Sequence, residues 1–145
     1  MVTIGIDPGK NGGIAGIINN KKFIVKRCPN DNDPYKMAKI IKQIIGKNRK
    51  VDIIIENVWA FPGDSSMSAF KFGTNYGIWQ GIFGTMGLKF RKVVPQTWQK
   101  DYQPLSKVKK ERKNELKEIS KGFYKKPTLQ TSDAILIAVW GKNNV

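Results

Sequence analysis

The chain has 145 residues, and its 26 basic and 11 acidic side chains give a formal charge of +15 at pH 7. Its length and its hydrophobic content of 40% predict a single domain over residues 1–145, because a chain of this size builds one core. The absence of histidine and the single cysteine exclude His-dependent catalytic sets, zinc sites made of His or Cys, and an internal disulfide.

The first part of the chain predicts strands followed by a helix. Short β-branched runs joined by tight turns predict an antiparallel meander over residues 2–7, 14–18 and 22–27. Apolar residues recur at helical spacing between Asp33 and Gly46, so we expect a helix that begins after the first residue and stops at the second. A nearly continuous apolar run at 51–56 is typical of a buried strand that lies parallel to its neighbour.

A long helix is predicted over residues 66–86, with its aromatic residues on one face. Gly73, Gly77 and Gly81 form a second stripe at four-residue spacing. Each glycine inside a helix costs up to about 1 kcal/mol relative to alanine. We therefore expect the glycine stripe to meet a close neighbour, in the first place the sheet.

The remaining elements are shorter. We expect, in order, a strand over residues 89–94, a helical turn over 95–100 and a helix over 106–119. A last helix runs to about Trp140, with Thr128 or Thr131 as its cap and Gly141 at its end. This order predicts an α/β fold, a mixed five-stranded sheet of an antiparallel meander plus parallel strands, with helices on both faces.

Three acidic residues stand in apolar settings at the ends of predicted elements, Asp7, Glu56 and Asp133. If the first and fourth strands are adjacent and parallel, Asp7 and Glu56 share one sheet edge, and Asp133 faces that edge from the last helix. Three carboxylates without a basic partner repel one another inside a protein, and a divalent cation removes that cost. Oxygen ligands select Mg²⁺, with Mn²⁺ as a substitute, and two such ions suit phosphodiester cleavage. Taken singly, the three residues could instead be a turn cap, a lone ion pair and a helix cap.

The glycine-rich turn from Asp7 to Gly13 has a second interpretation. A strand that ends in aspartate before glycines also holds phosphates in the actin-like and sugar-kinase ATPases. Those folds need a second lobe, for which 145 residues leave no room, so we expect no nucleotide cofactor.

The charge of the chain favours a polyanionic partner, and nucleic acid is the obvious one. Residues 89–126 hold 13 of the basic side chains and only four acidic ones. A solvated, lysine-rich helix face is the alternative for any single residue there. No apolar run approaches the roughly 20 residues that cross a bilayer, and the start has no secretory pattern. We expect a cytoplasmic location, associated with a nucleoid or with viral DNA, and no membrane association.

Four segments resemble, in order, the motifs of RuvC-type Holliday junction resolvases of the RNase H-like superfamily: Ile4–Gly9, Ile55–Trp59, Ser68–Gly77 and Thr131–Ala134. The resemblance covers nearly the whole chain, and we interpret it as a compact phage or viral form. It implies an RNase H-like nuclease domain in which Asp7 and Glu56 take the first two metal-binding positions. Asp133 takes the last one. The family has Asp or His three residues earlier, where this chain has Gln130, and we expect Gln130 to share a helix face with Asp133 and to assist as a weaker metal ligand.

The resemblance also implies DNA contacts. Trp59 lies where the family carries an aromatic residue that stacks on unpaired bases, and Phe61 is the competitor for that role. Lys71, within the third motif, is also expected to contact DNA. The family's catalytically important lysines fall at or beside Gln99, Lys100, Lys107, Lys109 and Lys110.

We therefore predict a Mg²⁺-dependent endonuclease that cuts four-way or other branched DNA and leaves 5′-phosphate and 3′-hydroxyl ends. The resemblance implies a homodimer, and the long helix over 66–86 is the candidate interface. Two alternatives remain open. One is a junction-binding protein without catalysis, which Gln130 favours. The other is an RNase H-like nuclease that cuts flaps, forks or RNA–DNA hybrids.

Overall fold

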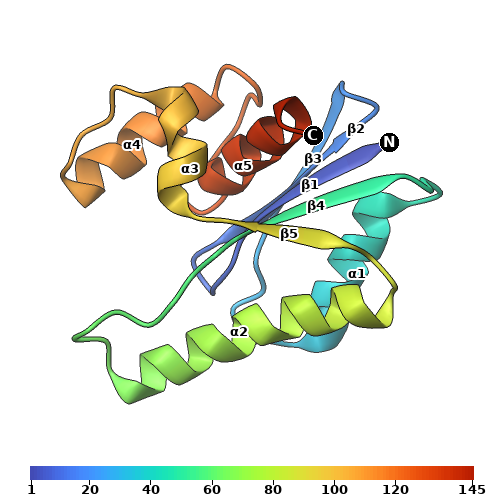
Figure 1. Cartoon of the computed structure of the whole chain (residues 1–145), viewed down its shortest axis with the longest axis horizontal. Coiled ribbons are helices and arrows are strands. Elements are labelled where there is room, and N and C mark those ends of the chain that lie inside the picture. The colour runs from blue at the N-terminus through green and yellow to red at the C-terminus, as the bar shows by residue number, and fades with distance from the viewer.

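A computed structural model describes residues 1–145, which build one five-stranded sheet (Figure 1). The strands are β1 (Val2–Asp7), β2 (Gly13–Ile18), β3 (Lys22–Arg27), β4 (Val51–Glu56) and β5 (Phe90–Val93). They lie in the order β3-β2-β1-β4-β5. The pairs β1–β2 and β2–β3 are antiparallel, whereas β1–β4 and β4–β5 are parallel. The predicted mixed sheet is therefore confirmed.

Helices cover both faces of this sheet, as expected. The helices α1 (Pro34–Ile45) and α2 (Ser66–Thr85) lie on one face (Figure 1). The other face carries α3 (Pro95–Gln99), the 3-10 helix η1 (Lys100–Tyr102), α4 (Lys109–Ser120) and α5 (Ser132–Asn143). None of the helices is both long and apolar enough to cross a membrane.

The two-residue period of β1 sorts its side chains between two layers. Val2, Ile4 and Ile6 are fully buried in the core that β1 shares with α1 and α2. Gly5 faces the other way, and a Cβ added there would overlap the backbone of Ala134 and Ala138 in α5. Because no side chain intervenes, α5 packs directly on β1 and lies almost entirely buried.

The ends of α1 follow the sequence signals. The Asp33 side chain accepts hydrogen bonds from the backbone N–H groups of Tyr35 and Lys36, which are otherwise unsatisfied donors of the first turn. Gly46 ends the helix with a φ of 54°, a conformation that favours glycine.

The close approach predicted for the glycine stripe of α2 is wrong. A Cβ added at Gly73, Gly77 or Gly81 would meet no atom within 4 Å, and all three residues are exposed. The fully buried rings of Trp79 and Phe83 hold α2 on the core instead. Since these rings occupy the sheet side of the helix, its glycines face solvent.

Two predicted helix boundaries also change. The helix expected from Ser106 begins at Lys109, because the Ser106 hydroxyl accepts a hydrogen bond from the Val108 N–H and stays outside the helix. The last helix does not stop at Gly141 but continues to Asn143. A Cβ at Gly141 would overlap Ile54 of β4, so this glycine allows close packing rather than ending the helix.

Candidate active site

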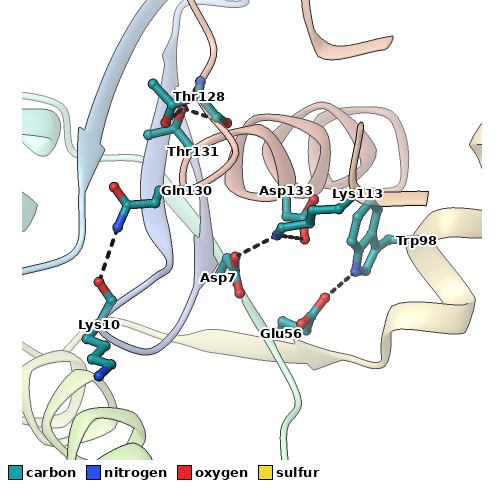
Figure 2. Close-up of polar contacts among 9 residues, drawn as sticks. All are labelled: Asp7, Lys10, Glu56, Trp98, Lys113, Thr128, Gln130, Thr131 and Asp133. Carbon is teal, nitrogen blue, oxygen red and sulfur yellow. Dashed lines mark hydrogen bonds and ion pairs between the residues drawn. The ribbon is translucent and has the colours of Figure 1, made fainter. Parts of the chain in front are cut away.

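Three carboxylates meet at the carboxyl edge of the two central strands. Asp7 is the last residue of β1, and Glu56 is the last residue of the adjacent parallel strand β4. Asp133 lies in the first turn of α5, which packs across β1. Figure 2 shows the three side chains pointing toward one another. The structure thus brings together the acidic residues that the sequence singled out.

A lysine that we did not predict lies among these carboxylates. The Lys113 Nζ of α4 lies 2.6 Å from Asp133 Oδ2 and 3.8 Å from Asp7 Oδ2 (Figure 2). The expectation that the three acidic residues have no basic partner is therefore wrong. Lys113 belongs to the lysine-rich segment, but no local pattern separates it from its neighbours. The packing of α4 against α5 selects it.

The electrostatics of the site reflect burial and incomplete neutralisation. Burial raises the pKa of Asp7 well above its ordinary value, and the charges of Asp133 and Glu56 raise it further, while Lys113 opposes them. Burial likewise raises the pKa of Glu56 to about 7. Burial lowers the pKa of Lys113, but its carboxylate neighbours outweigh this effect and leave that pKa above its ordinary value. One ammonium does not compensate three carboxylates.

Glu56 is held by a residue that the sequence did not single out. The indole Nε1 of Trp98 donates a hydrogen bond of 2.7 Å to Glu56 Oε2 (Figure 2). Trp98 is fully buried in α3, which begins at Pro95 directly after β5. A buried indole needs a partner for its N–H, and Glu56 is that partner here. The bond fixes one carboxylate oxygen and leaves Oε1 free.

The turn after Asp7 is also fixed from a distance. The Gly9 N–H donates a 2.7 Å hydrogen bond to Asn75 Oδ1, and the Trp79 indole donates to the same oxygen. Asn75 is buried among the aromatic residues of α2. A lone amide on an otherwise apolar helix face was the signal that could have identified it, because a buried amide requires partners.

Gln130 does not join the carboxylates. It precedes the first residue of α5, so it shares no helix face with Asp133, contrary to our expectation. Its Nε2 donates a hydrogen bond of 3.5 Å to the Lys10 carbonyl (Figure 2). The helix starts later than the motif implied because Thr131 is the N-cap residue, and its hydroxyl accepts a bond from the Thr128 N–H.

The chemistry of the cluster fits a hard divalent cation. Its donors are carboxylate oxygens, the ligands that Mg²⁺ and Mn²⁺ prefer. Asp133 Oδ1 is buried and has no hydrogen-bond partner, and neither has the Ser132 hydroxyl beside it. In this arrangement, however, no three acidic or thiol side chains are spaced to hold one ion. The Lys113 ammonium occupies the position between Asp7 and Asp133 where a cation would compensate their charge.

The predicted aromatic contacts lie at the surface beside the site. Trp59 and Phe61 follow β4 in the loop that leads to α2, and 47% and 62% of these residues are exposed. Their ring centroids are 5.9 Å apart with a tilt of 50°. They therefore form one exposed pair rather than two separate candidates.

The predicted basic contacts are spread more widely. Lys100, Lys107, Lys109 and Lys110 are exposed on η1, the following loop and the start of α4, while Gln99 is half-buried and Lys71 is exposed on α2. None of them forms an ion pair with Asp7, Glu56 or Asp133. The lysine at the carboxylates is Lys113, rather than Lys110 or the position of Gln99.

Comparisons with known proteins identify the fold. No protein-family model matches the chain, and no curated protein sequence does. Its structure is similar to Thermus thermophilus RuvC in complex with a Holliday junction substrate, with a TM-score of 0.66 and 17% sequence identity, over 97% of this chain and 91% of that one. A second Thermus thermophilus RuvC structure gives a TM-score of 0.62 and 16% identity, over 97% and 92% of the two chains. The predicted RuvC-type, RNase H-like fold is confirmed.

Proposed function

We propose that this chain is a divalent-metal-dependent endonuclease that resolves four-way or other branched DNA junctions. The observation that carries the proposal is the meeting of Asp7, Glu56 and Asp133 at the carboxyl edge of a sheet that has the fold of RuvC. One of the similar structures holds a Holliday junction substrate. The net charge of +15 supports a polyanionic substrate for this chain.

The carboxylates would hold Mg²⁺ or Mn²⁺, and the reaction class calls for two ions. When bound, such ions supply the charge neutralisation and the activated water that in-line displacement at phosphorus requires. Asp133 Oδ1 and Glu56 Oε1 are the free ligand atoms, because their partner oxygens already accept bonds from Lys113 and Trp98. Gln130, which bonds Lys10, is a ligand only if its side chain turns away from that carbonyl.

Lys113 would act beside the carboxylates as a cationic group. Its raised pKa keeps it protonated at neutral pH. Before ions bind, its ammonium compensates part of the charge of Asp7 and Asp133. A third of its side chain is exposed, so the ammonium has room to turn toward the scissile phosphate once a metal takes over this compensation. There it would stabilise the negative charge that develops on the phosphate oxygens.

The exposed pair of Trp59 and Phe61 would recognise the branch point. Bases at a crossover are unpaired and present flat faces, and stacking on an aromatic ring contributes about 1–3 kcal/mol per base. Linear duplex DNA offers no such faces. The pair would therefore favour branched over linear DNA.

Resolution of a junction requires two nicks, and we propose that a homodimer supplies the two active sites. The exposed glycine stripe of α2 and the exposed Phe70 on the same helix are the candidate interface. Glycine allows two helices to approach closely, since it has no side chain between the backbones.

The test is cleavage of a labelled four-way junction and a matched linear duplex in Mg²⁺, Mn²⁺ or EDTA. We expect paired symmetric nicks in the junction alone, with 5′-phosphate and 3′-hydroxyl ends. Cleavage should disappear in EDTA and in Asp7→Asn. Cleavage of flaps, forks or RNA–DNA hybrids in preference to the junction would redirect the assignment to another RNase H-like nuclease.

One observation favours a second candidate, a junction-binding protein without catalysis. The Lys113 ammonium already compensates Asp7 and Asp133, and no three acidic side chains are spaced for one ion. This candidate predicts tight junction binding without cleavage in either metal. Gln130→Asp would then be the variant with which to seek cleavage, because it adds a carboxylate near the site.

A further inference from the structure

A second basic surface lies across the carboxylates from Lys113. We propose that a groove between the end of β3 and α1 binds the phosphodiester backbone of the DNA beyond the scissile phosphate. This inference rests on the proposed function. The surface, here called the basic groove, is a hollow of about 580 Å³ whose charged lining is Lys10, Lys26, Arg27, Asp31, Lys36 and Lys39.

The charge of the basic groove is largely uncompensated. Asp31 is its only acidic residue, and it pairs with Lys36. The other four cations, all exposed, form no ion pair with any carboxylate of the chain. Positive charges gathered in one hollow neutralise successive phosphates and release their counterions, which is the main source of affinity for DNA.

The sheet register connects the basic groove to the carboxylates. Asp7 pairs with Gly13 across β1 and β2, and Gly13 pairs with Arg27 across β2 and β3. Two strand spacings of about 4.8 Å place the backbone of Arg27 roughly 10 Å from that of Asp7, at the same edge of the sheet. A nucleic-acid strand at the carboxylates therefore reaches the groove within a few ångströms of its length.

The near end of the basic groove is built from residues next to the acidic ligands. Lys10 follows Asp7 by three residues, and Gln130 precedes Asp133 by three; both line the hollow. Figure 2 shows the Gln130–Lys10 pair on the opposite side of Asp7 from Lys113. The positive side chains thus continue on both sides of the carboxylates, as a bound backbone requires.

The lining of the basic groove favours backbone contacts over base recognition. Only two of its 12 lining residues are hydrophobic, and none is aromatic. It therefore lacks a platform on which bases could stack. Lysine and arginine contacts to phosphates set the position of DNA and carry no direct sequence information. We expect the groove to hold one arm of the junction in place irrespective of its sequence.

The test compares two triple variants that remove the same charge. Lys26→Gln/Arg27→Gln/Lys39→Gln empties the groove of three cations. Lys47→Gln/Arg49→Gln/Lys50→Gln removes two lysines and one arginine, all exposed, from the turn before β4. That turn adjoins the start of β4, about 20 Å along the strands from the carboxylates, since six residues rise roughly 3.3 Å each.

Dissociation constants for a labelled four-way junction and a duplex are measured in EDTA over a range of salt concentrations. We expect the groove variant to bind at least about tenfold more weakly at low salt and to lose roughly three from the salt slope, near one per phosphate contact. The control variant should change that slope by less than about one. Thermal midpoints close to wild type exclude misfolding as the cause.

Equal losses in both variants would mean that only overall charge matters, and would overturn the groove assignment while leaving the proposed function intact. Unchanged binding in the groove variant would overturn it as well. If inorganic tripolyphosphate binds the wild type but not the groove variant, while DNA affinity is the same for both, the groove is a small-anion site and the inference is wrong. A wild-type chain that binds no DNA overturns both the proposed function and this inference.

Discussion

The Lys113 ammonium lies 2.6 Å from Asp133 Oδ2, and this contact joins two helices that pack on the same face of the sheet. Asp7 lies 3.8 Å from the same ammonium. The lysine thereby connects the helix that carries Asp133 to the strand that carries Asp7. Its removal tests how far these carboxylates depend on a positive charge.

Lys113→Met is expected to destabilise the metal-free protein by about 1–3 kcal/mol at pH 8, because two largely buried carboxylates lose their cation. The lower part of this range reflects the exposed third of the lysine side chain, which solvent already screens. Ca²⁺ should stabilise the variant more than the wild type, since no ammonium has to be displaced. Urea unfolding in EDTA and in Ca²⁺ measures both effects. Lys117→Met on the same helix is the control, and equal stability of Lys113→Met and wild type in EDTA would contradict the prediction.

The raised pKa of Glu56 predicts a specific dependence of stability on pH. The folded protein holds this proton up to a pKa of about 7, whereas the ordinary value is 4.5. The folded state therefore binds more protons than the unfolded state between these values, and stability falls as the pH rises through this window. The burial of Asp7, whose pKa is also raised, acts in the same direction.

Glu56→Gln removes the Glu56 contribution to this pH dependence. We expect the variant and the wild type to be similar near pH 4.5, and the variant to be more stable by up to about 3 kcal/mol at pH 8, from the shift in pKa. Urea unfolding in EDTA between pH 4.5 and 8.5 measures the difference. Asp101→Asn, at an exposed carboxylate, is the control. A difference that does not vary with pH would show that Glu56 is not destabilised by burial of its charge.

The exposed aromatic pair predicts a selective effect on branched DNA. Trp59→Ala and Phe61→Ala should each weaken junction binding by about 1–3 kcal/mol, because a stacked base loses its platform. Duplex binding and the free energy of unfolding should stay within about 0.5 kcal/mol of wild type, as for other surface changes. Tyr35→Ala, at an exposed ring on α1, is the matched control. Equal losses for junction and duplex would assign the pair to general DNA binding.

The solvent-facing glycines of α2 predict how the chain associates. Gly77→Ala should stabilise the monomer by up to about 1 kcal/mol, because the added methyl group meets no atom and alanine favours the helix. Gly77→Leu should shift a homodimer toward monomer if α2 is the interface. Sedimentation velocity over a range of concentrations measures the shift. A dimer unaffected by leucine would place its interface elsewhere.

The sequence was sufficient to predict how Asp7 and Glu56 come together. Each ends a short strand, and the nearly continuous apolar run before Glu56 indicates a strand that is buried between parallel neighbours. Adjacent parallel strands bring their last residues to one edge, so only the order of the strands had to be inferred. Asp133 followed from its position in the first turn of an apolar helix.

Lys113 and Gln130 could not be placed in this way. The lysine-rich segment offers many equivalent side chains, and only the packing of α4 on α5 determines which one reaches Asp133. Gln130 was assigned to a helix face that does not extend to it, because the Thr128–Thr131 turn delays the start of α5. The glycines of α2 misled for a related reason, since their spacing marks a bare helix surface but not what lies opposite.

Gly5 sets the position of a charged group that it never touches. Any side chain at this position would overlap the backbone of α5 at Ala134 and Ala138 and push the helix away from β1. Asp133, next to Ala134, would move with it, while Asp7, two residues farther along β1, would stay. A single methyl group, apolar and remote from every carboxylate, would thus open the spacing between the two acids. The distance across the reaction centre is therefore determined by an atom that the chain leaves out.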